Sequence, residues 1–222
     1  MRISERLTML RFDVGQAYLW RDGDDLTLID TGPAGSGPLI AAAVRALGLD
    51  TAAIRRVVLT HGHNDHAGSA AEVRSWHGAP VHAHRADTAL VEGAAPPPEP
   101  VIDEPWEREL FDRIVPGVPA APGCPVDVVL DGGDTLDGGF RVLSVPGHTP
   151  GSVALHVPEH GVLFTGDTVA THEGRVILGV FNSDPARARA SFALQAALDE
   201  VEVVCVGHGD PVGARALRAA VG

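Results

Sequence analysis

Short apolar runs, separated by glycine-rich or charged turns, predict a chain in which strands and helices alternate. The first third has runs that fit strands at residues 7–14, 17–21, 26–30, 57–60 and 81–83 and helices at residues 38–47 and 69–77. The last third has runs that fit strands at residues 126–130, 140–145, 152–157, 162–165 and 201–206 and helices at residues 185–198 and 213–220. Asp184 suits the N-cap of the helix that Pro185 begins. The pattern predicts an α/β fold built from layers of sheet and helix.

The middle of the chain, residues 87–125, has a different pattern. Prolines between residues 96 and 100 exclude a helix interior or a central strand there. Residues 104–115 fit a short helix with four apolar side chains spaced to share one face: Trp106, Leu110, Phe111 and Ile114. We expect one domain over residues 1–222, with residues 87–125 as an insertion too short to hold its own core. The apolar face either walls a pocket for a partly apolar substrate, with Trp106 in that wall, or packs into the core.

The composition is that of a globular protein. Hydrophobic residues make up 45% of the chain and mean hydropathy is +0.09, and no apolar run approaches the length of a membrane span. Charges interrupt residues 1–7, so we expect no secretory signal and a cytoplasmic location. A formal net charge of −12 without any basic run argues against nucleic acid as a partner. The chain contains no lysine, which excludes a Schiff-base or phosphate-loop lysine and leaves His, Asp, Glu or a metal to perform any chemistry.

The two cysteines do not form a disulfide framework and lack the spacing of a metal-binding or redox pair. Cys205 lies in an apolar run, which predicts a buried side chain. Cys124 lies in a loop rich in proline and glycine, where an exposed thiol is the expectation.

The segment from Thr60 to His66 holds four residues of the types that bind metals. A predicted strand precedes this segment and a predicted helix follows it, so we expect the four side chains on a tight loop: His61, His63, Asp65 and His66. Neutral imidazole and carboxylate groups together suit zinc, iron and similar cations. A solvated histidine-rich loop is the alternative.

Three later segments repeat this arrangement. Each is a predicted strand followed by a glycine and then by one metal-ligand side chain, in turn His148, Asp167 and His208. If these strands share one edge of the layered core, their ends converge. Seven side chains exceed the four or five that one ion needs, whereas two ions that share Asp167 would use all of them.

With these motifs the chain resembles the metallo-β-lactamase superfamily over its whole length. The resemblance rests on the segment 28–32, the His-x-His-x-Asp-His loop, the strand ends at 148 and 167, and the segment 207–209. It implies an α/β fold, namely a four-layer αβ/βα sandwich of two mixed β-sheets flanked by helices, with a dinuclear site at the sheet edges. It places His61, His63 and His148 on the first metal and Asp65, His66 and His208 on the second, with Asp167 bridging them.

Two further positions follow from the resemblance. Asp30 matches the family aspartate that orients metal ligands from behind them, although an ordinary turn residue at a strand end is the alternative. His172 follows the bridging Asp167 by five positions and is a possible pocket residue.

The dinuclear assignment implies two Zn²⁺ per chain, with Fe or Mn as alternatives, and a hydroxide held between the ions. Asp65 is then both a ligand and the best candidate to accept and relay the proton. The expected reaction is hydrolysis of an ester, thioester or lactone of a small acyl compound. Open alternatives are β-lactam or phosphoester hydrolysis, a mononuclear iron enzyme that handles oxygen or sulfur, and a metal-binding protein without catalysis. Both a monomer and a homodimer remain open.

The branches of that family differ at positions that can be compared with this sequence. The bridging Asp167 argues against β-lactamases with a histidine at the second metal, and no helical region that grips glutathione follows His208, as it does in glyoxalase II enzymes. Homoserine-lactone lactonases have a tyrosine after the bridging aspartate, but the only tyrosine here is Tyr18. The RNA-cleaving branch needs a basic surface, and residues 174–177 do not match the segment of persulfide dioxygenases. A general acyl hydrolase remains, with residues 87–125 expected to select its substrate.

Overall fold

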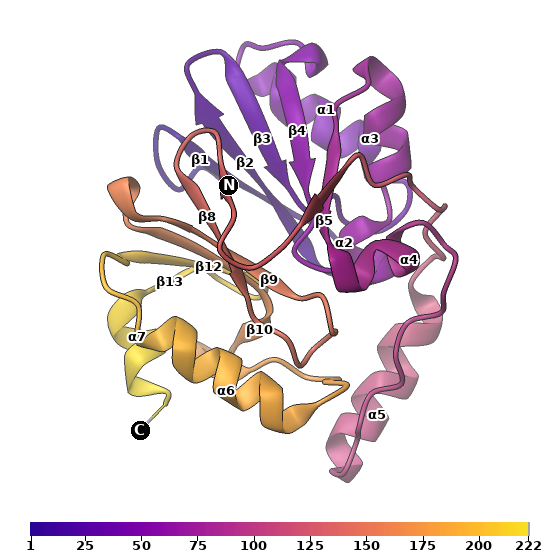
Figure 1. The fold of residues 1–222 in the computed structure, drawn as a ribbon, viewed down its shortest axis with the longest axis vertical. Coiled ribbons are helices and arrows are strands. Elements are labelled where there is room, and N and C mark those ends of the chain that lie inside the picture. Colours follow the sequence, from indigo (N-terminus) through magenta and orange to yellow (C-terminus); the bar gives the residue numbers. More distant parts are fainter. Residues whose placement is uncertain (222) are drawn as a thin grey trace. The chain divides into compact units, whose positions relative to one another are not determined.

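The computed structural model describes residues 1–221 and divides into two compact units. Unit 1 comprises Met1–Pro97 and Pro116–Val129, and unit 2 comprises Pro98–Val115 and the chain from Leu130 onward. Each unit contains one mixed β-sheet with helices (Figure 1). The expected insertion is therefore divided, because its helical part belongs to unit 2 and its two ends belong to unit 1. That all of these residues form one domain stays a prediction.

The sheet of unit 1 has six strands in sequential order, β1-β2-β3-β4-β5-β6. The strands are β1 (Leu7–Arg11), β2 (Gln16–Asp22), β3 (Asp25–Ile29), β4 (Ile54–Val58), β5 (Val81–His84) and β6 (Val128–Leu130). The first three strands pair antiparallel, whereas β3, β4 and β5 run parallel. Parallel neighbours end at the same edge of a sheet, so the residues that follow β3 and β4 lie close together.

The helices of unit 1 connect these strands. They are α1 (Gly37–Ala46), α2 (Asn64–Ala67), α3 (Ala70–His77) and α4 (Thr88–Val91), with 3₁₀ turns at Thr51–Ala53 and Arg85–Asp87. Helices α1 and α3 lie beside β3 and β4 (Figure 1), and Ile40, Val44 and Val73 share one buried cluster with Leu28 and Val57. Burial of one such side chain contributes about 1.5–3 kcal/mol, so this packing holds the parallel strands and their ends in place.

The sheet of unit 2 has seven strands in the order β13-β12-β10-β9-β8-β7, with β11 paired to β10. The strands are β7 (Thr135–Leu136), β8 (Phe140–Ser144), β9 (Val153–Val157), β10 (Val162–His172), β11 (Arg175–Leu178), β12 (Val203–His208) and β13 (Val212–Gly213). Strands β10 and β12 pair parallel, whereas β9 pairs antiparallel with β8 and β10, and β7, β11 and β13 pair antiparallel with β8, β10 and β12. This order places the C-terminal end of β12 beside β10.

The helices of unit 2 are α5 (Pro105–Ile114), α6 (Pro185–Ala196) and α7 (Ala214–Ala219), with a 3₁₀ turn at Pro158–His160; a further 3₁₀ turn, Val115–Gly117, joins the units. Phe192 of α6 and Leu217 of α7 are buried with Leu163 and Val204 of the sheet, which α6 and α7 line in Figure 1. The Asp184 carboxylate accepts a hydrogen bond from the Arg187 amide, which confirms its predicted N-cap role.

Most of the predicted elements are confirmed within a few residues, but β10 is longer than its apolar run suggests. It extends from Val162 to His172 because β11 pairs with its second half, from Val169 to His172. Gly166 has φ +52, and the register with β12 shifts on both sides of it, which marks a β-bulge. Asp167 therefore lies inside a bulged strand, and the prediction that it follows a strand end is wrong. A bulge re-aims the neighbouring side chain, so the irregular backbone still directs this carboxylate.

Helix α5 forms as predicted but presents a different face to the protein. Its half-buried positions are Glu107, Leu110, Phe111 and Ile114, at helical spacing, whereas Trp106 is 55% exposed. The prediction that Trp106 shares the apolar face is therefore wrong. Because neighbouring positions on a helix are about 100° apart, Glu107 and not Trp106 lies on the half-buried face.

The expected exposure of Cys124 is also wrong, because its side chain is buried in the core of unit 1. The Cys124 amide donates to the Val91 carbonyl, which ties the returning segment to α4. Burial raises the pKa of the Cys124 thiol to about 11, so the thiol stays protonated at neutral pH. Cys205 is buried as predicted.

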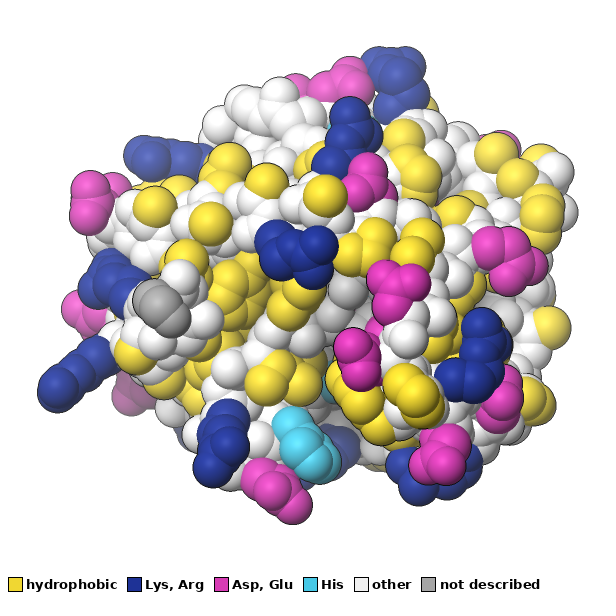
Figure 2. Space-filling view, turned by 90° about the horizontal axis from the view of Figure 1, so that it is seen from below, with side chains coloured by type: hydrophobic (Ala, Val, Ile, Leu, Met, Phe, Trp, Pro, Cys, Tyr) yellow, Lys and Arg dark blue, Asp and Glu magenta, His cyan; other side chains and the backbone are white. Residues whose placement is uncertain are grey.

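Two surface properties bear on partners. Within residues 1–221, no helix is both long enough and apolar enough to cross a membrane. On the face drawn in Figure 2, arginine side chains and acidic side chains are interspersed and do not gather by sign.

Candidate metal centre

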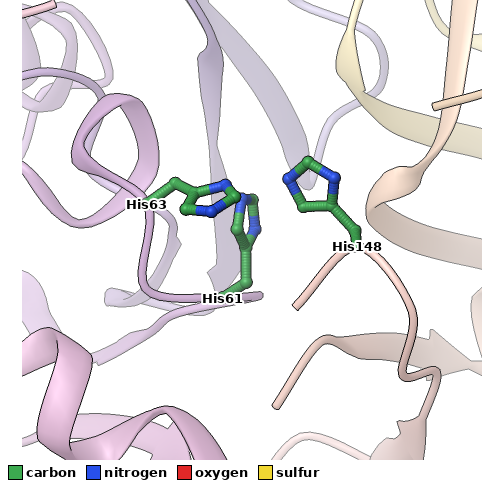
Figure 3. A group of neighbouring side chains, drawn as sticks. All are labelled: His61, His63 and His148. Carbon is green, nitrogen blue, oxygen red and sulfur yellow. The ribbon is translucent and has the colours of Figure 1, made fainter. Parts of the chain in front are cut away.

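The four ligand candidates of unit 1 all follow β4. His61 and His66 are buried, while His63 and Asp65 are partly exposed. The rings of His61 and His63 meet edge to face with centroids 4.8 Å apart (Figure 3), and the centroids of His61 and His66 are 4.3 Å apart. Asp65 and His66 belong to the short helix α2, so the expectation of one continuous loop is wrong for these two residues. The turn of helix brings His66 back toward His61.

Asp30, which follows β3, is hydrogen-bonded to Thr60 and His66 of this segment. Its carboxylate accepts hydrogen bonds from the Thr60 amide at 2.7 Å, the Thr60 hydroxyl at 2.8 Å and His66 Nδ1 at 2.9 Å. Asp30 has φ +58, a left-handed conformation that costs about 1–2 kcal/mol in a residue other than glycine. Hydrogen bonds to a charged acceptor contribute about 1.5–3 kcal/mol each, so three of them more than offset that strain.

These contacts determine which ring nitrogen His61 and His66 present. The Thr60 hydroxyl has one proton, which it donates to Asp30, so at its 3.0 Å contact with His61 Nδ1 it must accept. His61 and His66 therefore both carry the proton on Nδ1 and leave Nε2 as a lone-pair donor. His66 Nε2 lies 3.6 Å from Asp65 Oδ2. A metal ion would need this tautomer, since its ligand nitrogen must be unprotonated.

In unit 2, His148 follows β8 after a Pro-Gly corner. Gly147 has φ +139, and a β-carbon there would collide with the main chain of Ala188 in α6. The buried His148 places Nδ1 at 3.1 Å from the Val180 carbonyl oxygen, to which it can only donate. Its Nε2 is thereby left as the ligand atom, in the ring that Figure 3 labels.

Asp167 lies between two histidines of the same unit. Its Oδ2 atom is 3.5 Å from His148 Nε2 and 3.1 Å from His208 Nε2. His208 ends β12, and its place opposite Ala170 follows from the parallel pairing with β10. Gly207 is required beside it, because a β-carbon there would collide with Asp167 Oδ1. One carboxylate oxygen therefore contacts two imidazole nitrogens that face it from different segments.

The separations between these donor atoms test whether the residues fit a metal. Two donors at 2.0–2.1 Å from one tetrahedral ion lie about 3.3 Å apart. The separations within the units are 3.1, 3.5 and 3.6 Å for the pairs His208–Asp167, His148–Asp167 and His66–Asp65. Neutral imidazoles with Nε2 presented and carboxylates at these spacings fit zinc, iron or manganese. The donor set is therefore suited to a metal.

The two candidate pocket residues, His172 and Trp106, both lie at exposed positions of unit 2. His172 is exposed at the tip of the β10–β11 hairpin, where it pairs with Arg175. Trp106 is exposed on α5. That either side chain lines a substrate pocket stays a prediction.

The structure adds two groups that the sequence pattern did not single out. Thr60 links Asp30 to His61, and the Val180 carbonyl fixes the ring of His148. Thr60 could have been found from its place between a strand end and a histidine. A main-chain carbonyl has no signature in a sequence, because every residue has one.

Known proteins resemble this chain in sequence over most of its length. The model of the metallo-beta-lactamase superfamily matches residues 10–208. Hydroxyacylglutathione hydrolase of Fuscovulum blasticum is 31% identical over 172 residues, which cover 77% of this chain and 54% of that protein. This chain thus spans about half the length of that relative. The probable metallo-hydrolase YflN of Bacillus subtilis (strain 168) is 28% identical over 214 residues, 86% of this chain and 78% of YflN.

A solved structure matches over nearly the whole chain. TTHA1623 in a di-iron-bound form is 31% identical, with a TM-score of 0.70 and 96% of both chains covered. The predicted fold class, two mixed β-sheets flanked by helices, is confirmed by the strand pairing and by this match.

Proposed function

Because this chain belongs to the metallo-β-lactamase superfamily, we propose that it is a hydrolase that binds two metal ions and cleaves an ester, thioester or lactone of a small acyl compound. The proposal assigns His61, His63 and His148 to one ion and Asp65, His66 and His208 to the other, with Asp167 shared by both. This assignment comes from the family resemblance. The net charge of −12 supports a small molecule, and not a nucleic acid, as the substrate.

The observation that carries the proposal is the position of Asp167. Its Oδ2 atom lies within 3.5 Å of His148 Nε2 and 3.1 Å of His208 Nε2. His148 donates its Nδ1 hydrogen to the Val180 carbonyl, so its neutral ring turns the Nε2 lone pair toward this anionic oxygen. A cation held between the two atoms would satisfy both of them.

Two bound cations would lower the pKa of a water molecule, polarise the scissile carbonyl and neutralise charge on the leaving group. The residues of the chain hold and move the other groups. Asp65 accepts the proton that the attacking water releases, since its carboxylate lies beside His66 and is partly exposed. Asp30 and Thr60 keep the rings of His61 and His66 in the tautomer that leaves Nε2 unprotonated.

The similar proteins support parts of this proposal. The name hydroxyacylglutathione hydrolase supports hydrolysis of an acyl compound, and the description of YflN supports a metallo-hydrolase. The di-iron-bound form of TTHA1623 supports two ions and makes iron a direct alternative to zinc. Both ions, and manganese, suit the donor set.

Metal content is the first test. Protein loaded separately with zinc, iron and manganese is analysed for metal per chain and assayed on esters, thioesters, lactones, a chromogenic β-lactam and a phosphoester. We expect about two ions per chain and turnover of an ester, thioester or lactone. Less than about one ion per chain would contradict the dinuclear assignment. Oxygen consumption by an iron-loaded form without hydrolysis would favour a redox enzyme instead.

The second test separates proton transfer from metal binding. We expect Asp65→Asn to keep most of the metal, because the amide oxygen remains a ligand, but to lower kcat by about 10²–10⁴-fold. Asp24→Asn is the matched control, since that side chain is 91% exposed in the same unit. Full activity of Asp65→Asn would rule out the proton role.

A further inference from the structure

Helix α5 and the residues just before it contact the segment 179–184 of unit 2. Phe181 donates its amide hydrogen to Glu107 Oε1 at 2.7 Å, and its ring meets the ring of Phe111 edge to face at 5.2 Å. The amide of Val101, just before the helix, donates to the Asn182 carbonyl at 2.9 Å. Glu107 and Phe111 are four positions apart on the half-buried face of α5, so one face of the helix makes both contacts with Phe181.

The same segment also makes hydrogen bonds with the metal-ligand candidate His148. The Val180 carbonyl accepts from His148 Nδ1 at 3.1 Å, and the Ser183 amide donates to the His148 carbonyl at 3.2 Å. The Gly179 amide donates to the Thr168 carbonyl at 3.1 Å, next to Asp167. The segment 179–184 therefore joins α5 on one side to the ligand-bearing strands on the other.

One peptide group connects Glu107 to His148. The carbonyl that accepts from His148 and the amide that donates to Glu107 belong to the same Val180–Phe181 peptide bond. No peptide bond among the described residues is cis, so this C=O and N–H point in opposite directions along one plane. A carboxylate at the N–H end polarises the peptide and makes its carbonyl oxygen a stronger acceptor for His148 Nδ1–H.

The backbone of Phe181, which follows this peptide bond, has an unfavourable conformation. Phe181 has φ +59, in the left-handed region that residues other than glycine rarely adopt. Such a conformation persists only when its surroundings impose it. Two contacts with α5, one through the amide and one through the ring, hold Phe181 from outside the segment.

We propose that Glu107 is a positioning residue for His148, acting through the Val180–Phe181 peptide. It fixes the direction of the carbonyl, and the carbonyl fixes the ring rotation and the Nδ1–H tautomer of His148. Carboxylates that contact ligand histidines directly have this effect in metal sites, and here one peptide lies between the two. The proposal rests on the proposed metal-dependent function, in which His148 is a ligand.

The test compares Glu107→Ala, which removes the acceptor, with Glu107→Gln, which keeps an oxygen acceptor. Glu109→Ala is the matched control, because it removes the same charge from an exposed position of the same helix. For Glu107→Ala we expect the zinc dissociation constant, measured by competition with a chelator, to rise about tenfold. Glu107→Gln and Glu109→Ala are expected to stay within about twofold of the unmodified protein. Thermal unfolding checks that all three variants fold.

A second readout needs no metal. In ¹⁵N-labelled, metal-free protein, the ring nitrogen signals of His148 report which nitrogen carries the proton. We expect a single Nδ1–H form in the unmodified protein and in Glu107→Gln, and a mixture of tautomers in Glu107→Ala. An unchanged ring signal together with unchanged zinc affinity in Glu107→Ala would overturn the proposal. If the unmodified protein bound no metal, the proposed function would fail, but the ring signal would still decide whether Glu107 positions His148.

Discussion

The two units carry their ligand candidates in opposite ways. In unit 1 all four lie between His61 and His66, whereas in unit 2 they come from three separate segments: His148 from the turn after β8, Asp167 from β10 and His208 from β12. The first set is arranged by one strand end and one turn of helix, which are local features. The second is arranged by the order and register of β8, β10 and β12. The spatial grouping of a contiguous set thus follows from sequence, whereas the spatial grouping of a dispersed set depends on the sheet.

The supports of the two sets differ as well. In unit 1 a side chain, Asp30, fixes the rings of His66 directly and of His61 through Thr60. In unit 2 a main-chain carbonyl, that of Val180, fixes His148. A substitution of Asp30 removes the first support directly. No substitution removes a main-chain carbonyl, so the second support can be changed only through the residues that hold its peptide group. Mutations of both kinds therefore test whether this contrast is real.

The largest effect is expected at the centre of the dispersed set. Asp167→Ala removes the oxygen that His148 and His208 both face, and we expect metal content to fall by about one ion per chain and hydrolysis by more than about 10⁴-fold. Metal analysis and steady-state kinetics measure both. Asp199→Ala, at an exposed position of the same unit, is the control. Two ions per chain in Asp167→Ala would show that the carboxylate bridges nothing.

A smaller effect is expected for the support of the contiguous set. Asp30→Asn tolerates the left-handed backbone but can no longer accept all three hydrogen bonds, so the metal dissociation constant should rise about 10–100-fold. The free energy of unfolding should fall by about 1–3 kcal/mol, as an amide hydrogen then faces a donor in a buried place. Chelator competition and urea unfolding measure the two changes. Asp25→Asn on the same strand should change neither, and a normal metal affinity in Asp30→Asn would reduce Asp30 to a turn residue.

The smallest effect is expected at the far end of unit 1, where Asp127 pairs with Arg74 of α3. The side-chain hydrogen bond from Arg74 lowers the pKa of Asp127 to about 2, so its contribution to stability is present above about pH 4 and is lost as pH falls toward 2. Because the pair is partly exposed, Asp127→Asn should lower the free energy of unfolding by only about 0.5–1 kcal/mol at pH 7.

The comparison is sharpened by what Asp127→Asn should leave unchanged. If the contiguous ligand set is arranged locally, metal content stays at the unmodified level although α3 is loosened. Urea unfolding at pH 7 and pH 3 should also show the difference between the two proteins shrinking at the lower pH. A loss of metal in this variant would mean that the set depends on distant packing.

Much of the fold was predictable from local pattern, since apolar period and turn residues marked nearly all of the longer strands and helices. The exceptions have physical reasons. Strand β10 continues past Thr165 because β11 pairs with it, and no local signal at a bulge reveals such pairing. The two-residue strands β7 and β13 are too short to have a period. Cys124 is buried because the segment that holds it returns to the core of unit 1.

The sequence by itself determined which donors are present, their order along the chain and the close grouping of His61, His63, Asp65 and His66. These follow from residue identity and from geometry over a few positions. Only the tertiary structure decided that β12 runs beside β10, so that His208 reaches Asp167, and that the Val180 carbonyl meets His148. The physical reason is that main-chain hydrogen bonding groups are alike at every residue, so their partners depend on packing between distant segments and not on the identity of one side chain.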